Sequence, residues 1–157
     1  MKSIESSFIH LIDFGISKYY IVNGVHIKRK KVKFFSGNVL FSSKNAFRNL
    51  ELSRRDDLIS LCYLLIFFLK GSAKWVKEPY DADRRQLYKS VGYAKNKLKP
   101  SQLCTGSASE LLPFCENIFD LKFEEEPNYG KLRHMLVSIL MKKNQAPDMM
   151  YDWSKFK

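Results

Sequence analysis

The chain is 157 residues long, 45% hydrophobic and 14% aromatic, with a formal net charge of +11. The length suits one compact domain, and the apolar content excludes a disordered tail. No apolar run approaches the roughly 18 residues of a membrane span, so we expect no membrane partner. The excess of Lys and Arg predicts an anionic partner, but charge alone does not separate nucleic acid, lipid and acidic peptide.

The amino-terminal residues 1–7 contain no apolar segment and no small-residue cleavage pattern, so they do not resemble a secretory signal. An intracellular location, in the cytoplasm or the nucleus, is therefore expected. The three cysteines, Cys62, Cys104 and Cys115, are unevenly spaced and form no CxxC pair. We expect them to be small core residues and not zinc ligands or disulfide partners.

In chain order, the first predicted element is a short strand. The apolar, β-branched run from Phe8 to Ile12 ends at Asp13-Phe14-Gly15, which predicts a brief buried strand that enters a turn. Residues 16–36 show no sustained period and predict a long basic loop. A turn is expected within it at Asn23-Gly24, where positive φ costs little.

The next predicted element is a central helix. Ser53 can cap it, and Asp56 and Asp57 fall in its first turn, where the positive end of the helix dipole favours acids. Residues 58–69 are almost uniformly apolar, which predicts a helix that is buried on all sides. The helix should end at Lys70-Gly71, a basic last turn followed by a glycine cap.

Three further helices are predicted, over about 82–97, 109–121 and 128–141. Their apolar residues recur at helical spacing, and we detect no internal repeat or linker. We therefore expect one mainly α unit with a short β element. The positions expected to face inward are Leu87 and Val91 in the first helix, Leu112, Cys115, Ile118 and Phe119 in the second, and Leu132, Met135, Leu136, Ile139 and Leu140 in the third.

The tripeptide Asp13-Phe14-Gly15 carries the first chemical signal. By itself it is weak, but an apolar run precedes it and a long loop follows, as around the kinase aspartate that holds magnesium on nucleotide phosphates. The alternative is a local turn in which Asp13 accepts hydrogen bonds from nearby amides.

A second motif makes the first specific. The segment 53–63, Ser-Arg-Arg-Asp-Asp-Leu-Ile-Ser-Leu-Cys-Tyr, is followed one helix later by Gly71-Ser72-Ala73-Lys74-Trp75, and together they resemble the casein kinase I family of serine/threonine protein kinases. The resemblance covers nearly the whole chain from about Phe8 onward. Further matches in order are Ser36-Gly37, Leu103-Cys104, Phe123-Glu124-Glu125, Pro127-Asn128-Tyr129, Leu132-Arg133 and Asp152-Trp153.

The resemblance implies a protein kinase-like fold of which residues 1–157 form a partial domain, the C-terminal lobe. Only twelve residues precede Asp13, too few for the glycine-rich loop, the strand lysine and the catalytic-loop aspartate and asparagine of a kinase. We therefore expect no phosphoryl transfer from this chain alone. Kinases also cover the central helix with a helix that precedes the catalytic loop, so Leu61, Leu65 and Phe68 are expected to be uncovered.

Family likeness also implies roles for single residues. Asp13 would be the magnesium ligand for Mg-ATP in the complete kinase, and Asp57 would hold the backbone of the catalytic loop. Lys33 and Arg84 would contact acidic or phosphate-primed protein substrates, since cationic side chains bind phosphate strongly. Phe14, Gly15 and Arg133 complete the kinase motifs. The alternative for Lys33 and Arg84 is a solvated basic surface.

The sequence departs from the family pattern at Leu40, where an arginine usually joins the anion site, and at Cys62, which replaces a glycine. Two other functions stay open. One is a non-catalytic kinase-like module, a pseudokinase, that binds an acidic protein. The other is nucleic-acid binding through the basic run 28–33, which is not expected because no nucleic-acid-binding fold signature accompanies it.

Overall fold

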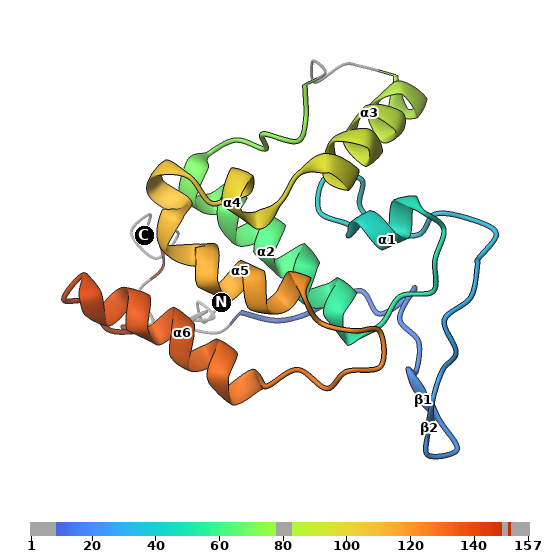
Figure 1. Cartoon of the computed structure of the whole chain (residues 1–157), viewed down its shortest axis with the longest axis horizontal. Helices are drawn as coiled ribbons and strands as arrows, with labels where there is room; N and C mark the ends of the chain where they lie inside the picture. Colours follow the sequence, from blue (N-terminus) through green and yellow to red (C-terminus); the bar gives the residue numbers. More distant parts are fainter. Residues whose placement is uncertain (1–8, 78–82, 149–150, 152–157) are drawn as a thin grey trace, which may run out of the picture.

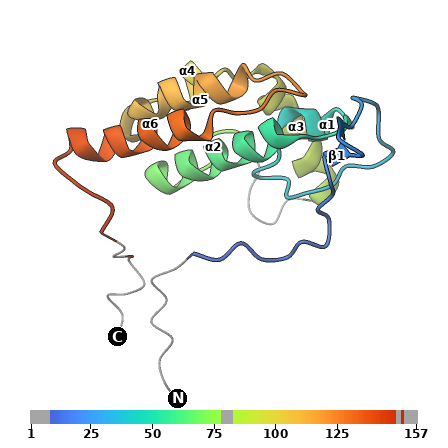
Figure 2. The same cartoon turned by 90° about the horizontal axis from the view of Figure 1, so that it is seen from below.

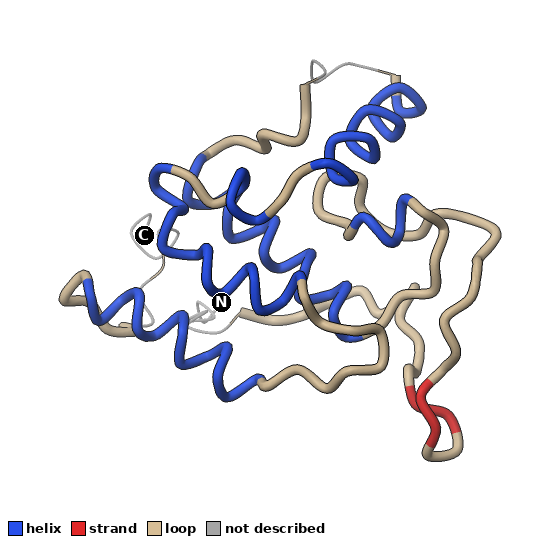
Figure 3. Tube along the Cα trace, in the orientation of Figure 1, coloured by secondary structure: helices blue, strands red, loops and turns tan. Residues whose placement is uncertain are grey.

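The computed structural model describes residues 9–77, 83–148 and 151. These residues form a mainly helical fold with one small hairpin (Figure 1, Figure 3), so the predicted fold class is confirmed. The elements in chain order are β1 (Ile21–Val22), β2 (Val25–His26), α1 (Lys44–Phe47), α2 (Arg54–Lys70), α3 (Arg84–Lys97), α4 (Pro100–Leu103), the 3-10 helix η1 (Gly106–Leu111), α5 (Leu112–Phe119) and α6 (Tyr129–Lys142).

The central helix α2 begins and ends where the sequence predicts. Ser53 is its N-cap, and the backbone N–H of Ser53 donates to Asp56 Oδ2 at 3.0 Å. An acid in the first turn thus satisfies an amide that has no partner within the helix. Gly71 ends the helix with a φ of 66°, a left-handed conformation that costs glycine little.

One side of α2 forms the centre of the core. Its buried residues pack against α5 and η1, and α6 lies against α5 (Figure 1). The three cysteines are free and buried, which confirms their predicted core role. The core cluster consists of Ile59, Cys62, Tyr63, Ile66, Trp75, Val91, Leu103, Cys104, Ala108, Leu111, Phe114, Cys115, Ile118 and Leu132.

The other side of α2 faces solvent. Phe68 is 67% exposed and Leu61 37%, which confirms that these two side chains are uncovered, whereas Leu65 is partly buried against the core. The prediction of a helix buried on all sides is therefore wrong on this side. Figure 2 shows the amino-terminal segment running below α2, on the side away from α4 and α5.

The predicted strand over residues 8–12 is not found where the structure describes the chain, from residue 9 onward. Ile9, Leu11 and Ile12 are all more than 70% exposed. A strand needs a partner for its backbone groups, and the described strands β1 and β2 pair with each other. The β element of this fold therefore follows the Asp-Phe-Gly motif instead of preceding it.

The hairpin lies within the segment predicted as a loop. Ile21 pairs with His26 and Val22 with Val25 in antiparallel register. Asn23 and Gly24 form the turn with φ values of 52° and 77°, which confirms the predicted turn and is the positive-φ pair that tight hairpins require.

The remaining helices follow the prediction with changed boundaries. The predicted start at Ala82 lies outside the described residues, and α3 is described from Arg84. The helix predicted over 109–121 is divided into η1 and α5, with Pro113 in the first turn of α5. Helix α6 begins after Asn128, whose side chain accepts from the Lys131 amide. The short helices α1 and α4 were not predicted, since four residues are too few for a periodic signal.

Candidate functional site

A cleft of about 740 Å³ lies beside the start of α2. Its walls come from residues 16–20, from the segment 32–43 before α1 and from residues 50–60, with Tyr129 of α6 at one edge. Ser36, Gly37 and Asp57, which the sequence analysis singled out, all line this cleft. Its size is in the range of ligand-binding sites.

Two contacts hold the amino-terminal loop against the cleft. The ammonium group of Lys18 forms an ion pair with the buried carboxylate of Glu51. The guanidinium of Arg54 lies over the ring of Tyr20, 4.7 Å from its centroid. These contacts join residues about 30 positions apart, and no local sequence pattern indicated them.

Asp56 ties the start of α1 to α2 at the wall of the cleft. Its carboxylate is 1% exposed and accepts from Ser43 Oγ at 2.6 Å and from Asn45 Nδ2 at 2.8 Å. Its other oxygen accepts the Ser53 amide described above. A buried carboxylate needs such donors, so Asp56 fixes Ser43 in the cleft wall and Asn45 beside it. The sequence analysis treated it only as a first-turn acid.

Asp57, the next residue, is in a different environment. It is solvent-accessible and lines the cleft. Partial burial, together with the negative charge of Asp56, raises the pKa of the Asp57 carboxyl above its usual range. The folded chain thus holds a carboxylate in the cleft at some electrostatic cost, and such perturbed groups are frequent at functional sites.

The turn at residues 38–42 is held from behind by Lys95 of α3. Lys95 is 1% exposed, and its ammonium group donates to the carbonyl of Leu40 at 2.6 Å and of Ser42 at 2.7 Å. The Trp75 indole N–H donates to the same Leu40 carbonyl at 2.6 Å. Burial lowers the pKa of Lys95 to about 7. The backbone carbonyl of Leu40 is thus the anchor of this turn.

The sequence analysis did not predict the burial of Lys95, because a lysine in the last turn of a helix is usually solvated. Its ammonium group also lies 4.0 Å from the centroid of the Tyr63 ring. Aromatic faces and carbonyl oxygens thus take the place of a carboxylate partner around this side chain. Lys95 therefore links the core directly to the wall of the cleft.

The Asp-Phe-Gly residues lie outside the cleft. Asp13 and Phe14 are exposed, and Asp13 has a φ of 63°. Asp13 Oδ1 accepts the Gly15 amide at 3.3 Å, which is the local turn contact that the sequence analysis gave as the alternative. The chain meets the cleft directly after this turn, at Ile16.

A magnesium ion needs several oxygen ligands. Asp13 offers one carboxylate, and in the described part of the chain no cluster of three or more His, Cys, Asp or Glu side chains could hold a metal. The described residues therefore do not bring an acidic metal-binding cluster together around Asp13.

Lys33 and Arg84 are both exposed. Neither lines the cleft. Their segments meet through aromatic side chains, since the ring of Phe35 lies 5.1 Å from that of Tyr88 and 5.0 Å from that of Phe47. The fold thus brings the neighbourhoods of the two basic residues together. Arg133 is exposed on α6, a different element from those that carry Lys33 and Arg84.

No protein-family model matches the chain. It is 31% identical over 154 residues to casein kinase I homolog 2 of Schizosaccharomyces pombe and 34% identical over 154 residues to casein kinase I homolog 3 of the same organism. Each match covers 97% of this chain and 35% of the relative. The chain therefore spans about a third of the length of the curated relatives it matches.

The mainly helical fold and these similarities define a protein kinase-like chain. More narrowly, the chain is casein kinase I-like over nearly its whole length. The resemblance predicted from the motifs at 53–63 and 71–75 is confirmed. The closing motif at residues 152–153 lies outside the described residues. None of the described helices combines the length and apolar character needed to cross a bilayer.

Proposed function

We propose that the chain is the C-terminal lobe of a casein kinase I-like serine/threonine kinase, which transfers the ATP γ-phosphoryl group to Ser or Thr in acidic or phosphate-primed proteins inside the cell. Similarity along 97% of the chain to two casein kinase I homologs carries this proposal. The cleft beside Asp57 and the turn at 36–37 supports it, because two of the segments that resemble the kinase family, 36–37 and 53–63, both line it.

In this proposal Asp13 is the magnesium ligand, with Mg-ATP as the cofactor of the complete kinase, and Phe14 and Gly15 shape the turn that presents it. Asp57 holds the backbone of the catalytic loop in the complete kinase, and its exposure in the cleft leaves its carboxylate accessible for that contact. Lys33 and Arg84 contact substrate anions, and Arg133 belongs to a structural motif of the kinase lobe. The 157 residues hold no glycine-rich loop, strand lysine or catalytic base, so alone they should be inactive.

A chimeric kinase tests the proposal. The chain replaces the corresponding region of casein kinase I homolog 2 of S. pombe, which supplies the missing parts. We expect the chimera to phosphorylate casein and the chain alone to give only the buffer blank. Asp13→Asn should abolish chimera activity, because it removes a charged magnesium ligand. Arg84→Ala should weaken activity on phosphate-primed peptides about tenfold more than on unprimed ones.

The controls separate recognition from folding. Arg133→Ala lies on another exposed helix face and removes the same charge, so it should not discriminate between the two peptide classes. Equal losses on primed and unprimed peptides in Arg84→Ala would show that Arg84 is only surface charge. An inactive but well-folded chimera, or phosphorylation by the chain alone that disappears in Asp13→Ala, would overturn the proposal.

A second candidate function is a non-catalytic kinase-like module that holds an acidic protein. It is favoured by the continuous core, in which Trp75, Tyr63 and Phe114 are almost fully buried. A chain that purifies as a stable monomer and keeps one acidic partner through gel filtration would support this function.

A further inference from the structure

The β1–β2 hairpin lies at one end of the fold and extends away from the helices (Figure 1, Figure 3). None of residues 21–31 lines the cleft of the candidate site. Val22 and Val25 are paired across the hairpin and are 54% and 67% exposed. Tyr19 and Ile21 beside them are also exposed. The hairpin thus presents a small apolar tip to solvent.

The base of the hairpin is fixed to the rest of the fold. The half-buried ring of His26 lies 5.0 Å from the ring of Phe123, in the segment between α5 and α6. The amide of Ile27 donates to the carbonyl of Tyr20 at 2.8 Å, which extends the pairing of the two strands. The tip is therefore carried by an anchored element.

The two faces of the hairpin have different surroundings. Ile21 pairs with His26, so these two side chains share the face that is anchored at Phe123. Successive side chains of a strand point to opposite faces, which places Val22 and Val25 on the other face. Exposed apolar side chains that are grouped, and not scattered singly, mark interaction sites.

A strongly basic segment follows the hairpin. Residues 28–31 are Lys-Arg-Lys-Lys, and all four are exposed. Residues 14–50 include no Asp or Glu. Within the described part of the chain, Lys28, Arg29 and Lys30 form no ion pair. The name hairpin surface is used below for Tyr19, Ile21, Val22, Val25 and residues 28–31.

An acidic run, residues 124–126, follows Phe123 at the base of the hairpin. Glu126 lies 3.8 Å from the guanidinium of Arg54, and Glu125 Oε2 accepts the Lys122 amide at 2.9 Å. These two carboxylates thus have partners outside the hairpin surface, which keeps its positive charge.

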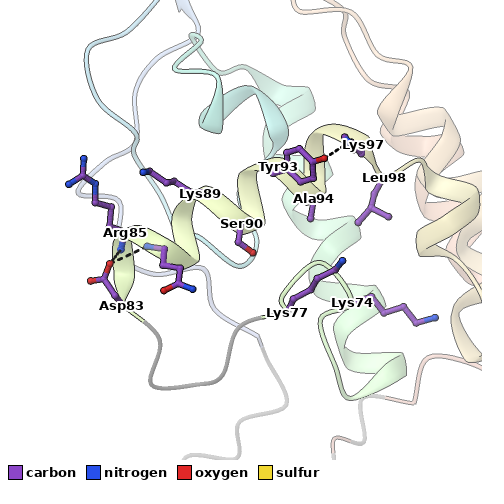
Figure 4. Close-up of a pocket in the computed structure, with 11 residues that line it drawn as sticks. Lys74, Lys77, Asp83, Arg85, Lys89, Ser90, Tyr93, Ala94, Lys97 and Leu98 are labelled. Atoms are coloured by element: carbon purple, nitrogen blue, oxygen red, sulfur yellow. Dashed lines mark hydrogen bonds between the residues drawn. The ribbon is translucent and has the colours of Figure 1, made fainter.

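The described surface has a second concentration of basic residues. A groove of about 840 Å³ lies between α3 and the loop after α2, with Lys74, Lys77 and Lys89 on its walls (Figure 4). Residues 78–82, which join the two walls in the chain, include two acids and lie outside the described residues. The described lining therefore does not define the charge of this groove, whereas residues 9–77, which contain the hairpin surface, are described throughout.

The spacing of apolar and basic groups in the hairpin surface suits a lipid bilayer. Lys28 follows Val25 by three residues, so the two are separated by at most about 10–11 Å along the chain. Apolar groups that bind a membrane interface enter about 5–10 Å into it. With Val25 at that depth, Lys28 and Arg29 reach the level of anionic headgroups, where each Lys or Arg strengthens binding.

The chemistry of the tip distinguishes a bilayer from other anionic partners. Single-stranded nucleic acid stacks its bases on aromatic faces, but Ile21, Val22 and Val25 are aliphatic. An acidic peptide bound along residues 28–31 would leave these side chains in water. A bilayer surface offers anionic headgroups and an apolar interior together, and Tyr19 is of the residue type enriched at that interface.

We infer that the hairpin surface docks on an anionic phospholipid bilayer, with Val22 and Val25 in the interface and residues 28–31 on the headgroups. The expectation of no membrane partner rested on the absence of a spanning apolar run, which does not bear on surface binding. The docking uses neither the cleft nor nucleotide, so it does not depend on the proposed kinase activity.

The test measures flotation of the full chain with phosphatidylcholine vesicles, with and without about 30% phosphatidylserine. We expect binding to the anionic vesicles alone, and less binding as added salt screens the charges. Lys28→Glu with Lys30→Glu should weaken it about tenfold or more. Lys131→Glu with Lys142→Glu, at exposed positions of α6, changes the net charge equally and should leave binding nearly unchanged.

A second pair of variants tests the tip. Val22→Ser with Val25→Ser should also weaken vesicle binding about tenfold, because two apolar side chains no longer leave water. Phe68→Ser with Leu69→Ser removes two exposed apolar side chains from α2 and is the matched control. It should leave binding nearly unchanged.

Val25→Trp keeps the tip apolar and adds a probe of depth. The introduced indole should be quenched by lipids that carry bromine in their acyl chains, beyond any quenching seen in the unsubstituted chain. This measurement needs no loss of binding, so it tests the inference even where the serine pair disturbs the hairpin.

The outcomes separate this inference from its rivals. Equal weakening by the two charge-reversal pairs would overturn it, as would loss of binding in the α2 pair but not in the tip pair. An introduced indole that brominated lipids do not quench would also overturn it. An oligonucleotide or a glutamate-rich peptide that binds residues 28–31 while vesicles do not would replace the bilayer as partner. Vesicle binding together with an inactive chimera would keep the docking surface while the kinase proposal fails.

Discussion

At the scale of single residues, two adjacent carboxylates at the start of α2 have different environments. Both were predicted as acids of the first helical turn, which is what local sequence can show. The partners of Asp56, Ser43 and Asn45, lie 13 and 11 residues earlier in the chain. A contact at that distance depends on the tertiary fold, so the burial of Asp56 and the exposure of Asp57 could not be predicted.

Asp56→Asn should therefore loosen the cleft wall, whereas Asp57→Asn should not. Asparagine at position 56 has no charge to strengthen the hydrogen bonds that Asp56 accepts, and its amide NH₂ group faces buried donors. We expect the free energy of unfolding to fall by about 1–3 kcal/mol. Asp57→Asn removes a carboxylate whose pKa is raised, hence a charge that the fold disfavours. Hydrogen exchange of the amides at 43–57, measured in the chimeric kinase, should accelerate only in Asp56→Asn. Acceleration in Asp57→Asn alone would reverse this assignment.

At the scale of elements, α3 was predictable and its tie to the cleft was not. Its inward residues Leu87 and Val91 follow helical spacing and are indeed partly or fully buried. Lys95 is on the same helix and is also buried, because three carbonyls of the 39–42 turn and the ring of Tyr63 surround its ammonium group. An analysis of apolar periodicity assigns lysine to the exposed side of a helix, so it could not predict that Lys95 is buried.

Lys95→Met should destabilise the chimeric kinase in a pH-dependent way. The variant leaves the buried carbonyls of Leu40 and Ser42 without this donor, at a cost of about 1–3 kcal/mol. Burial lowers the pKa of Lys95 to about 7 from an ordinary value of 10.5, so the unfolded chain binds more protons between these pH values. The free energy of unfolding contributed by Lys95 therefore rises with pH across that window.

Thermal unfolding of the chimera between pH 7 and pH 9 measures this effect. This range avoids the titration of Tyr63, whose pKa burial raises above 10. The deficit of Lys95→Met relative to the wild type should grow as the pH rises. Lys89→Met, at an exposed position of the same helix, is the control and should show no such trend. A constant deficit would mean that Lys95 has an ordinary pKa.

The predicted β structure illustrates the limit of local patterns in another way. The pair Asn23-Gly24 predicts a turn because its conformational preference is local, and the turn is present. The run 8–12 has the composition of a strand, but pairing depends on a neighbour that composition does not reveal. Residues 9–12 accordingly have no regular secondary structure and no partner strand in the part of the chain that the structure describes.

At the scale of the whole molecule, the apolar pattern predicted that α2 is part of the core but not which side of α2 faces solvent. The side of α2 that carries Ile59 and Ile66 is packed, while Leu61 and Phe68 on the other side face solvent. Leaving large apolar side chains exposed forgoes about 1.5–3 kcal/mol each. Typical domains have a total stability of only about 5–15 kcal/mol. We therefore expect the isolated chain to be helical but prone to association.

The most direct test of the proposed lobe is thermal unfolding with hydrophobic-dye binding, for the chain alone and with the amino-terminal region of casein kinase I homolog 2 of S. pombe added as a separate chain. Alone, the chain should bind the dye and show no sharp transition. With the added region, dye binding should fall and a cooperative transition should appear. A cooperative melt of the monomer alone, with little dye binding and no response to the added region, would contradict the account and favour the independent module.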